Sequence, residues 1–308
     1  EYESVQRAGC TLIMNLSGST LRSREAVMRQ GALVLVCGSL TRFFKRMTAV
    51  ICVLRCLHNL AASPQAVDQA RECGLIDIVI KVFKAYPREE LVLEASFALL
   101  WNLAMVPELA AEMLELGIIA DAVFSLSIFC EHTGVCISTA GLLRNLCTGH
   151  GQGEAAVFEV SKNGGISLLF DCLWTHCHPN LNMDLRTRDV FATPESTAVA
   201  EQVLAVLVNI TEPGRSGKSN ELHMAQVASE LAAEDHGVDK FKLVLQEHSH
   251  SQMVQYQGFR FLINLVSADA ELKRAFRGFG RHVRMMLRQH SLSKPIVDLG
   301  DLLLEDVA

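Results

Sequence analysis

The feature that most constrains this chain is a short motif that returns at a nearly constant interval. The motif is an asparagine followed by an apolar residue, and six copies recur at spacings of 44, 43, 43, 64 and 55 residues: Asn15-Leu16, Asn59-Leu60, Asn102-Leu103, Asn145-Leu146, Asn209-Ile210 and Asn264-Leu265. A glycine before an apolar run is a second marker, with copies 43 residues apart at Gly31, Gly74 and Gly117 and a fourth copy at Gly165. Such a period is typical of repeat architectures and not of one or two globular domains.

Local signals divide one period into three helices, as residues 63–104 illustrate. Ser63-Pro64 is predicted to be a helix N-cap followed by proline at the first helical position. The short helix ends at Gly74, because glycine tolerates the positive φ of a turn at a helix end. Apolar spacing predicts a second helix over 75–86 and a third over 89–104. A unit of this kind buries its apolar face only by stacking on its neighbours, which predicts an all-α solenoid.

Composition agrees with helices and excludes several classes of protein. Of the 308 residues, 50% are hydrophobic but only 6% are aromatic, and there are 7 prolines. The apolar content excludes intrinsic disorder, and an aliphatic core with little proline favours helices over β-sandwich strands. The net charge of −6 gives no general case for binding nucleic acid. No apolar run reaches the roughly 18 residues of a membrane span.

The ten cysteines lie mostly inside apolar runs, as Cys52 and Cys56 do. They are predicted to be small buried hydrophobic residues in a reducing compartment and not a disulfide framework. No signal peptide is visible. We therefore expect a cytoplasmic protein, with the nucleus and the cytoskeleton as alternatives.

The period, the three-helix unit, the glycine turn and the Asn-Leu-Ala, Asn-Leu-Ser or Asn-Leu-Cys ending of the third helix resemble the armadillo repeat family. The resemblance covers nearly the whole chain and is clearest for residues 10–150. It implies a right-handed α-solenoid of about six three-helix repeats, in which the third helices line a concave groove. It also implies protein–protein binding rather than catalysis.

The repeats are predicted to form a single domain over residues 1–308. Its parts are a truncated first repeat (1–17), regular repeats (18–150), irregular repeats with inserted loops (151–266) and C-terminal capping helices (267–308). The insertions are predicted near 174–195 and at 212–220, where loop-forming residues gather. They are either tolerated surface excursions or contacts for a partner.

The repeated asparagine has a chemistry suited to binding. One asparagine on each third helix forms a ladder with steps of about 10 Å. Its amide both donates and accepts, so it can hold the backbone of an extended peptide. The resemblance supports this role for Asn59, Asn102, Asn145, Asn209 and Asn264. In the alternative, these side chains bond neighbouring turns of the protein itself.

The residue one helical turn before each asparagine shares its face. Nuclear-import adaptors of the family carry tryptophan there, but this chain has Thr11, Arg55, Ala98, Gly141, Ala205 and Arg260. Trp101 lies beside its asparagine instead, so nuclear-import cargo is the less favoured alternative. Small residues at Ala98, Gly141 and Ala205 are predicted to leave room for a partner. An acidic partner segment is favoured by four arginines: Arg7, Arg55, Arg144 and Arg260.

A basic patch is predicted where six cationic residues lie within 16 residues: Lys273, Arg274, Arg277, Arg281, Arg284 and Arg288. A charge run of this kind is commonly a solvated face. The alternative is a site for an acidic protein segment or for the surface of an anionic membrane.

Two sequence patterns resemble a phosphate-binding loop and a zinc site, but their residue spacing does not match either kind of site. Gly217-Lys218-Ser219 resembles the end of a phosphate-binding loop, but Glu212 stands where that motif needs glycine. A dense cluster lacks the second, separated ligand pair of a zinc site: Cys172, His176, Cys177 and His178. We therefore predict no enzyme activity, no metal and no cofactor.

The sequence thus predicts a non-enzymatic scaffold or adaptor that binds an extended or helical, acidic segment of a partner protein in the groove. The rival hypothesis is an assembly module that binds through its convex face or its end caps. An apolar groove beside a polar convex face would favour the first hypothesis.

Overall fold

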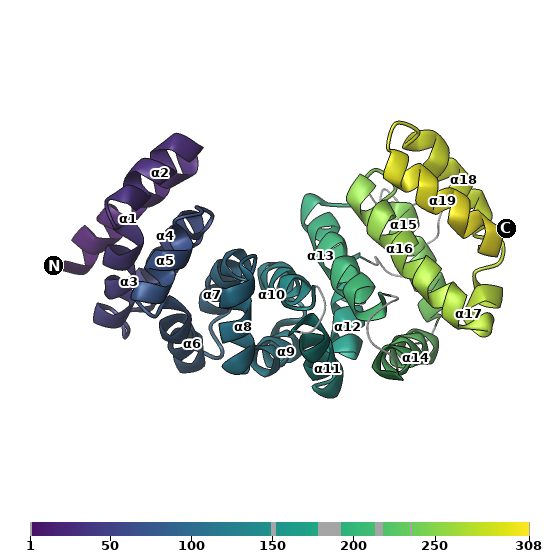
Figure 1. Ribbon diagram of the computed structural model, residues 1–308, viewed down its shortest axis with the longest axis horizontal. Helices are drawn as coiled ribbons and strands as arrows, with labels where there is room; N and C mark the ends of the chain where they lie inside the picture. Colours follow the sequence, from purple (N-terminus) through teal and green to yellow (C-terminus); the bar gives the residue numbers. More distant parts are fainter. Residues whose placement is uncertain (1, 149–151, 178–191, 213–217, 235, 308) are drawn as a thin grey trace. The chain divides into compact units, whose positions relative to one another are not determined.

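The computed structural model describes residues 2–148, 152–177, 192–212, 218–234 and 236–307. Every regular element within these ranges is a helix. The helices form two compact units, Glu1–Leu146 and Cys147–Ala308. Each unit is a stack of helices, coloured purple to teal in the first and teal to yellow in the second (Figure 1).

Unit 1 begins with one long helix, α1 (Tyr2–Ser19), and then repeats a three-helix order three times. The first helices are α2 (Leu21–Arg29), α5 (Ala66–Glu72) and α8 (Pro107–Glu115). The second helices are α3 (Ala32–Arg42), α6 (Leu75–Ala85) and α9 (Ile118–Phe129). The third helices are α4 (Met47–Ala61), α7 (Glu90–Leu103) and α10 (Thr133–Leu146).

Unit 2 contains the same order of helices within its described residues. The first helices are α11 (Gln152–Lys162), α14 (Lys218–Ala233) and α17 (Ala270–Ala275). The second helices are α12 (Gly165–Cys177), α15 (Gly237–Glu247) and α18 (Gly280–Gln289). The third helices are α13 (Pro194–Thr211), α16 (Gln252–Ala268) and α19 (Lys294–Val307).

Left-handed residues separate the first helix of a repeat from the second. Gly31, Gly74 and Gly117 have φ of 70°, 60° and 75°, as the glycine marker predicts. In unit 2 the corresponding residues are Gly164 (φ 75°), His236 (φ 57°) and Gly278 (φ 86°). The predicted marker Gly165 is therefore one residue late, because it is already the first residue of α12. His236 is a non-glycine residue in this region, which is why the glycine pattern alone misses that turn.

Three predicted boundaries are wrong. Helix α5 begins at Ala66, because Ser63 starts a turn in which its carbonyl accepts a hydrogen bond from the Ala66 N–H at 3.0 Å. Trp174 lies inside α12, so the first insertion starts later than predicted, and 178–191 are outside the described residues. Part of the second predicted loop, from Lys218 onward, is the start of α14, and 213–217 are again outside.

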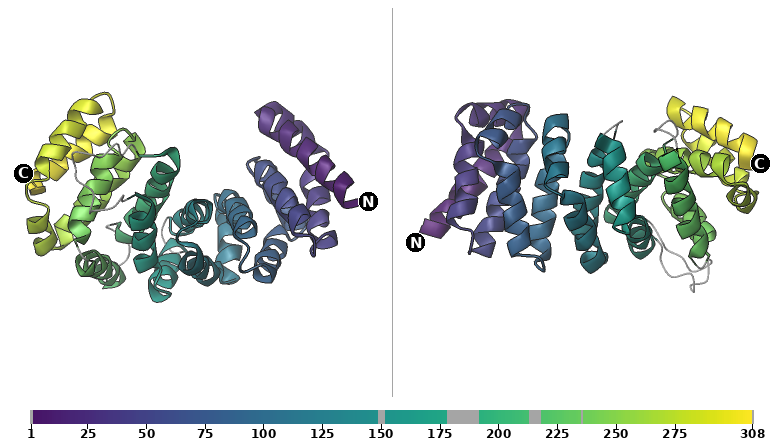
Figure 2. Two further views of the ribbon diagram at one scale, coloured as in Figure 1. Left: turned by 180° about the vertical axis from the view of Figure 1, so that it is seen from behind. Right: turned by 60° about the horizontal axis from the view of Figure 1, so that its bottom comes forward.

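The third helices lie side by side within each unit. In unit 1 the row is α1, α4, α7 and α10, and in unit 2 it is α13, α16 and α19 (Figure 2). Aliphatic residues such as Leu54, Leu57 and Leu60 fill the core between them and are fully buried. Burial of each such side chain stabilises the stack by about 1.5–3 kcal/mol. No helix within the described ranges is long and apolar enough to cross a membrane.

Candidate protein-binding face

In unit 1 each repeated asparagine after the first is bonded to the third helix before it. The Nδ2 atoms donate to three backbone carbonyls: Asn59 to Met14 at 3.4 Å, Asn102 to His58 at 3.0 Å and Asn145 to Trp101 at 3.0 Å. The acceptor is always the residue directly before the preceding asparagine of the motif. This bond therefore repeats with the period of the sequence and fixes the register between neighbouring third helices.

In unit 2 threonine hydroxyls replace the carbonyl acceptors. Asn209 Nδ2 donates to Thr148 Oγ1 at 3.1 Å, and Asn264 Nδ2 donates to Thr211 Oγ1 at 3.2 Å. Asn264 is buried, whereas Asn209 is half-buried like the asparagines of unit 1. Only 8% of Asn264 is exposed, so a partner could reach little of this side chain. The internal bonding that was the alternative for these asparagines is present at all five positions.

Trp101 fills the space that Gly141 was predicted to leave open. A Cβ atom on Gly141 would lie 2.5 Å from the indole ring, and the glycine is buried beneath it. The guanidinium carbon of Arg144 lies 5.5 Å from the ring centroid, and Arg144 also donates to Asn145 Oδ1 at 3.3 Å. Ala205 is buried as well, so only Ala98, which is half-buried, keeps part of the predicted room. Trp101, Arg144 and Asn145 thus form one cluster on α7 and α10.

The arginines of the predicted groove differ in their surroundings. Arg55 on α4 and Arg7 on α1 are exposed. Arg260 pairs with Glu212 at 3.3 Å and lies 5.6 Å from the centroid of the Tyr256 ring. Its charge is therefore partly compensated within unit 2. The acidic-partner prediction keeps its strongest support in unit 1.

Sequence reasoning missed His58 as a member of this face. Its Nδ1 lies 3.0 Å from the Ala98 carbonyl and 3.2 Å from Asn102 Nδ2. Burial lowers the pKa of His58, and the Ala98 carbonyl opposes that effect. His58 and Trp101 share one signal that could have found them, because both directly precede a motif asparagine and lie 43 residues apart.

Replacing Asn102 by alanine should lower the free energy of unfolding by about 1–2 kcal/mol, because the half-buried His58 carbonyl loses its side-chain donor. Asn15 is the matched control. It holds the same motif position on α1 but is exposed, so Asn15→Ala should change stability by less than about 0.5 kcal/mol. Chemical denaturation of both variants measures the difference, and equal losses would contradict the register bond.

The second-helix face carries apolar side chains too. Leu35 on α3 is 72% exposed, and Phe124 on α9 is 55% exposed. Phe124 also lines a cavity of about 230 Å³ between α6, α7 and α9, where Lys84 pairs with Asp121 at 3.1 Å. The face formed by the second helices is therefore not purely polar. The expected contrast between an apolar groove and a polar convex face is absent from these residues and does not favour binding at the third-helix face.

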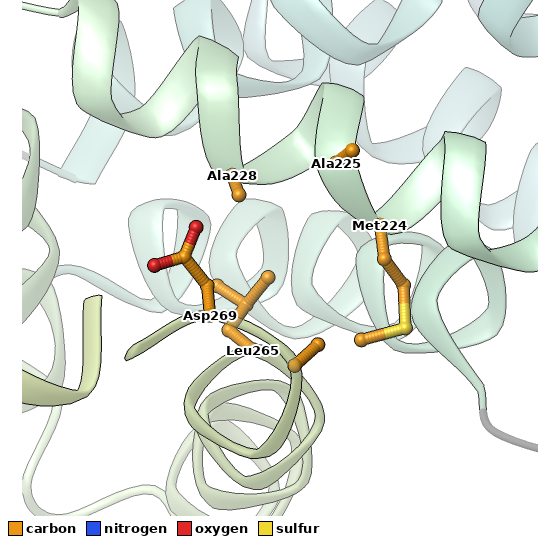
Figure 3. A pocket seen from close by; sticks show the side chains of 6 residues that line it. Met224, Ala225, Ala228, Leu265 and Asp269 are labelled. Carbon is orange, nitrogen blue, oxygen red and sulfur yellow. The ribbon is translucent and has the colours of Figure 1, made fainter. Parts of the chain in front are cut away.

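A cavity of about 180 Å³ lies between α14, α16 and the start of α17 (Figure 3). Apolar side chains line it together with the carboxylate of Asp269. That carboxylate accepts bonds from the backbone N–H groups of Glu271 and Leu272 at 2.7 and 2.9 Å, so it caps α17. Asp269 is the one titratable side chain among the residues that line this cavity. The cavity therefore offers no second group for acid–base chemistry.

The cysteines of the Cys and His cluster around α12 are buried in the fold. Cys172 and Cys177 are 1% exposed, and the Cys177 thiol donates to the Ser196 carbonyl at 3.2 Å. Burial raises the pKa of Cys177 far above its usual range. His178 and Gly217 are outside the described residues. Within the described ranges no three His, Cys, Asp or Glu side chains form a group that could hold a metal.

The predicted basic patch divides into two parts. Lys273 pairs with Asp306, and Arg274 Nε donates to the Ala270 carbonyl at 3.1 Å. The other four members are exposed: Arg277, Arg281, Arg284 and Arg288.

No family model and no curated protein sequence matches the chain. An engineered protein is 19% identical with a TM-score of 0.64 over 86% of this chain and 93% of its own. A designed armadillo repeat protein is 16% identical with a TM-score of 0.61 over 84% and 92%. A structure from a study of the interaction between cadherin and beta-catenin is 13% identical with a TM-score of 0.67 over 95% and 53%. The chain therefore has the armadillo-repeat fold, an α-solenoid of three-helix repeats.

Proposed function

We propose that the third-helix face of unit 1 binds an extended or helical segment of a partner protein, so that the chain acts as a scaffold or adaptor. The observation that carries this proposal is the row of half-buried asparagines at Asn59, Asn102 and Asn145 on three successive third helices. A side-chain amide offers two donors and an acceptor. The internal bond of Asn59 uses one donor, whereas Nδ2 of Asn102 lies near both the carbonyl and Nδ1 of His58, which leaves its acceptor oxygen. Asn59 and Asn102 can therefore also contact the backbone of a bound segment.

The side chains around this row favour a partner with acidic and apolar residues. Trp101 offers a half-buried aromatic surface with Arg144 beside it. Arg7 and Arg55 add exposed positive charge on α1 and α4. Aromatic and arginine side chains are the residues that most often dominate binding energy at interfaces. The cadherin and beta-catenin study is a precedent for protein binding by a protein of similar fold.

We propose no enzymatic role for the chain. The carboxylates that line the cavities described above already serve the fold, Asp269 as a helix cap and Asp121 in an ion pair. A catalytic site needs titratable groups that converge on a reacting atom. A binding role needs only the repeated face.

Arg55→Glu tests the proposal without touching a core contact, because the side chain is exposed. Acidic and basic peptides of equal length are titrated into the protein in a Trp174→Phe background, which leaves Trp101 as the fluorescent reporter. We expect the acidic peptides to bind and to lose about tenfold in affinity, or about 1.4 kcal/mol, in the Arg55→Glu variant.

Arg88→Glu is the matched control. Arg88 is exposed and lies outside the third helices, and its substitution changes the net charge by the same amount as Arg55→Glu. It should leave the affinity unchanged. Absence of binding by either class of peptide, or an equal loss in both variants, would contradict binding at this face.

A further inference from the structure

Helix α18 and the turn before it present a row of arginines directly to solvent. Arg281, Arg284 and Arg288 are spaced by three and four residues, which places them on one side of α18, and Arg277 lies in the turn that precedes the helix. All four are exposed. The opposite side of α18 is the packed one: His282, Val283 and Met286 are buried there.

The four arginines have no acidic partner among the described residues. The ion pair nearest to them in sequence joins Lys273 to Asp306, and no ion pair in the described residues includes a member of the row. Like charges one helical turn apart repel and weaken a helix. An anionic ligand would relieve that repulsion.

The shape of the row indicates what kind of anion fits it. Arg281 and Arg288 are separated by about 10 Å along the helix, so a single phosphate does not span the whole row. Apolar side chains accompany them: Met285 is 49% exposed, and Leu292, in the turn after α18, is fully exposed. A basic helix face with exposed apolar side chains is suited to the headgroup region of a lipid bilayer.

We propose that the outward face of α18 binds the surface of a membrane that contains anionic phospholipids. Arg277, Arg281, Arg284 and Arg288 contact headgroup phosphates, and guanidinium groups suit this task because they bond phosphate oxygens bidentately. Leu292 enters the interface between headgroups and acyl chains. This surface is on a second helix of the last repeat, at the end of the helix stack of unit 2 (Figure 1), and not on the third-helix face of unit 1.

Vesicle co-sedimentation tests the proposal with phosphatidylcholine vesicles that either contain or lack phosphatidylserine. The wild-type chain should bind only the anionic vesicles, and binding should weaken as salt is added. Replacing the four arginines of the row by glutamine should weaken binding at least tenfold, because each arginine near such a surface contributes about fivefold.

The matched control replaces four exposed arginines elsewhere by glutamine, with the same change in net charge: Arg22, Arg29, Arg71 and Arg88. It should bind like the wild type. Leu292→Ser should weaken vesicle binding while leaving its salt dependence unchanged. Circular dichroism establishes that each variant is folded.

No binding of the wild type to anionic vesicles, or equal losses in the two fourfold variants, would overturn the proposal. If the wild type does not bind vesicles but binds arrayed phosphopeptides through the same arginines, the row is a peptide site and the membrane proposal is wrong. Arg55→Glu should leave vesicle binding unchanged, so this proposal and that for the third-helix face fail independently.

Discussion

Replacing Gly141 by alanine should destabilise the protein by about 1–3 kcal/mol, the usual effect of inserting a methyl group into a filled site. The new Cβ would lie 2.5 Å from the indole of Trp101, so the ring has to move. Arg144 lies over the same ring, and the Trp101 carbonyl accepts the Asn145 bond. The substitution should therefore also disturb the proposed binding face.

Denaturant unfolding and Trp101 fluorescence in the Trp174→Phe background measure the two effects. Gly38→Ala is the control, because Gly38 is an exposed glycine inside α3 with no atom within 4 Å of an added Cβ. Alanine is the better helix former, so this variant should gain about 0.5–1 kcal/mol. We therefore expect the free energy of unfolding to fall in Gly141→Ala and to rise in Gly38→Ala. A stabilised Gly141→Ala variant would show that Trp101 is not held against this glycine.

Acidification from pH 7 to pH 4 should lower the free energy of unfolding by up to about 3 kcal/mol through His282 alone. Burial lowers the pKa of His282 from 6.5 to about 4. Its ring lies 4.7 Å from that of Phe279, and Nε2 is 3.3 Å from Gln255 Oε1. Between pH 6.5 and pH 4 the unfolded chain binds a proton that the folded protein does not, so stability falls as the pH falls. Above pH 7 this contribution is fully present.

His282→Phe tests the assignment, since phenylalanine keeps a ring against Phe279 but cannot titrate. Unfolding of this variant should depend less steeply on pH between 6.5 and 4 than unfolding of the wild type. The remaining slope should come in part from His58 and His248, because burial lowers the pKa of both. An unchanged slope in the variant would contradict the assignment to His282.

Helix positions could be predicted closely where the period is regular. The predicted helices over 75–86 and 89–104 are α6 (Leu75–Ala85) and α7 (Glu90–Leu103). Apolar spacing and turn glycines act within a few residues, so one sequence suffices to locate them. The prediction is weaker where a turn lacks its glycine, as at His236, or where an insertion breaks the interval, as after Trp174.

The candidate site was predictable only as a set of positions. The motif places Asn59, Asn102 and Asn145 at equivalent places on third helices, and this holds in the structure. What each amide bonds depends on a carbonyl 44 or 45 residues away on another helix. Arg260 likewise has its charge partly compensated by Glu212, 48 residues earlier.

The sequence by itself determined the repeat, its three-helix order and the helix that carries each asparagine, because these follow from local spacing and turn chemistry. Only the tertiary structure decided that Trp101 covers Gly141, that Asn264 is buried and that no ion pair among the described residues includes the arginines of α18. The physical reason is that burial and pairing are properties of neighbouring helices. The helical period in the sequence indicates which residues share a face of a helix. Whether that face is buried against protein or exposed to solvent depends on the neighbouring helix.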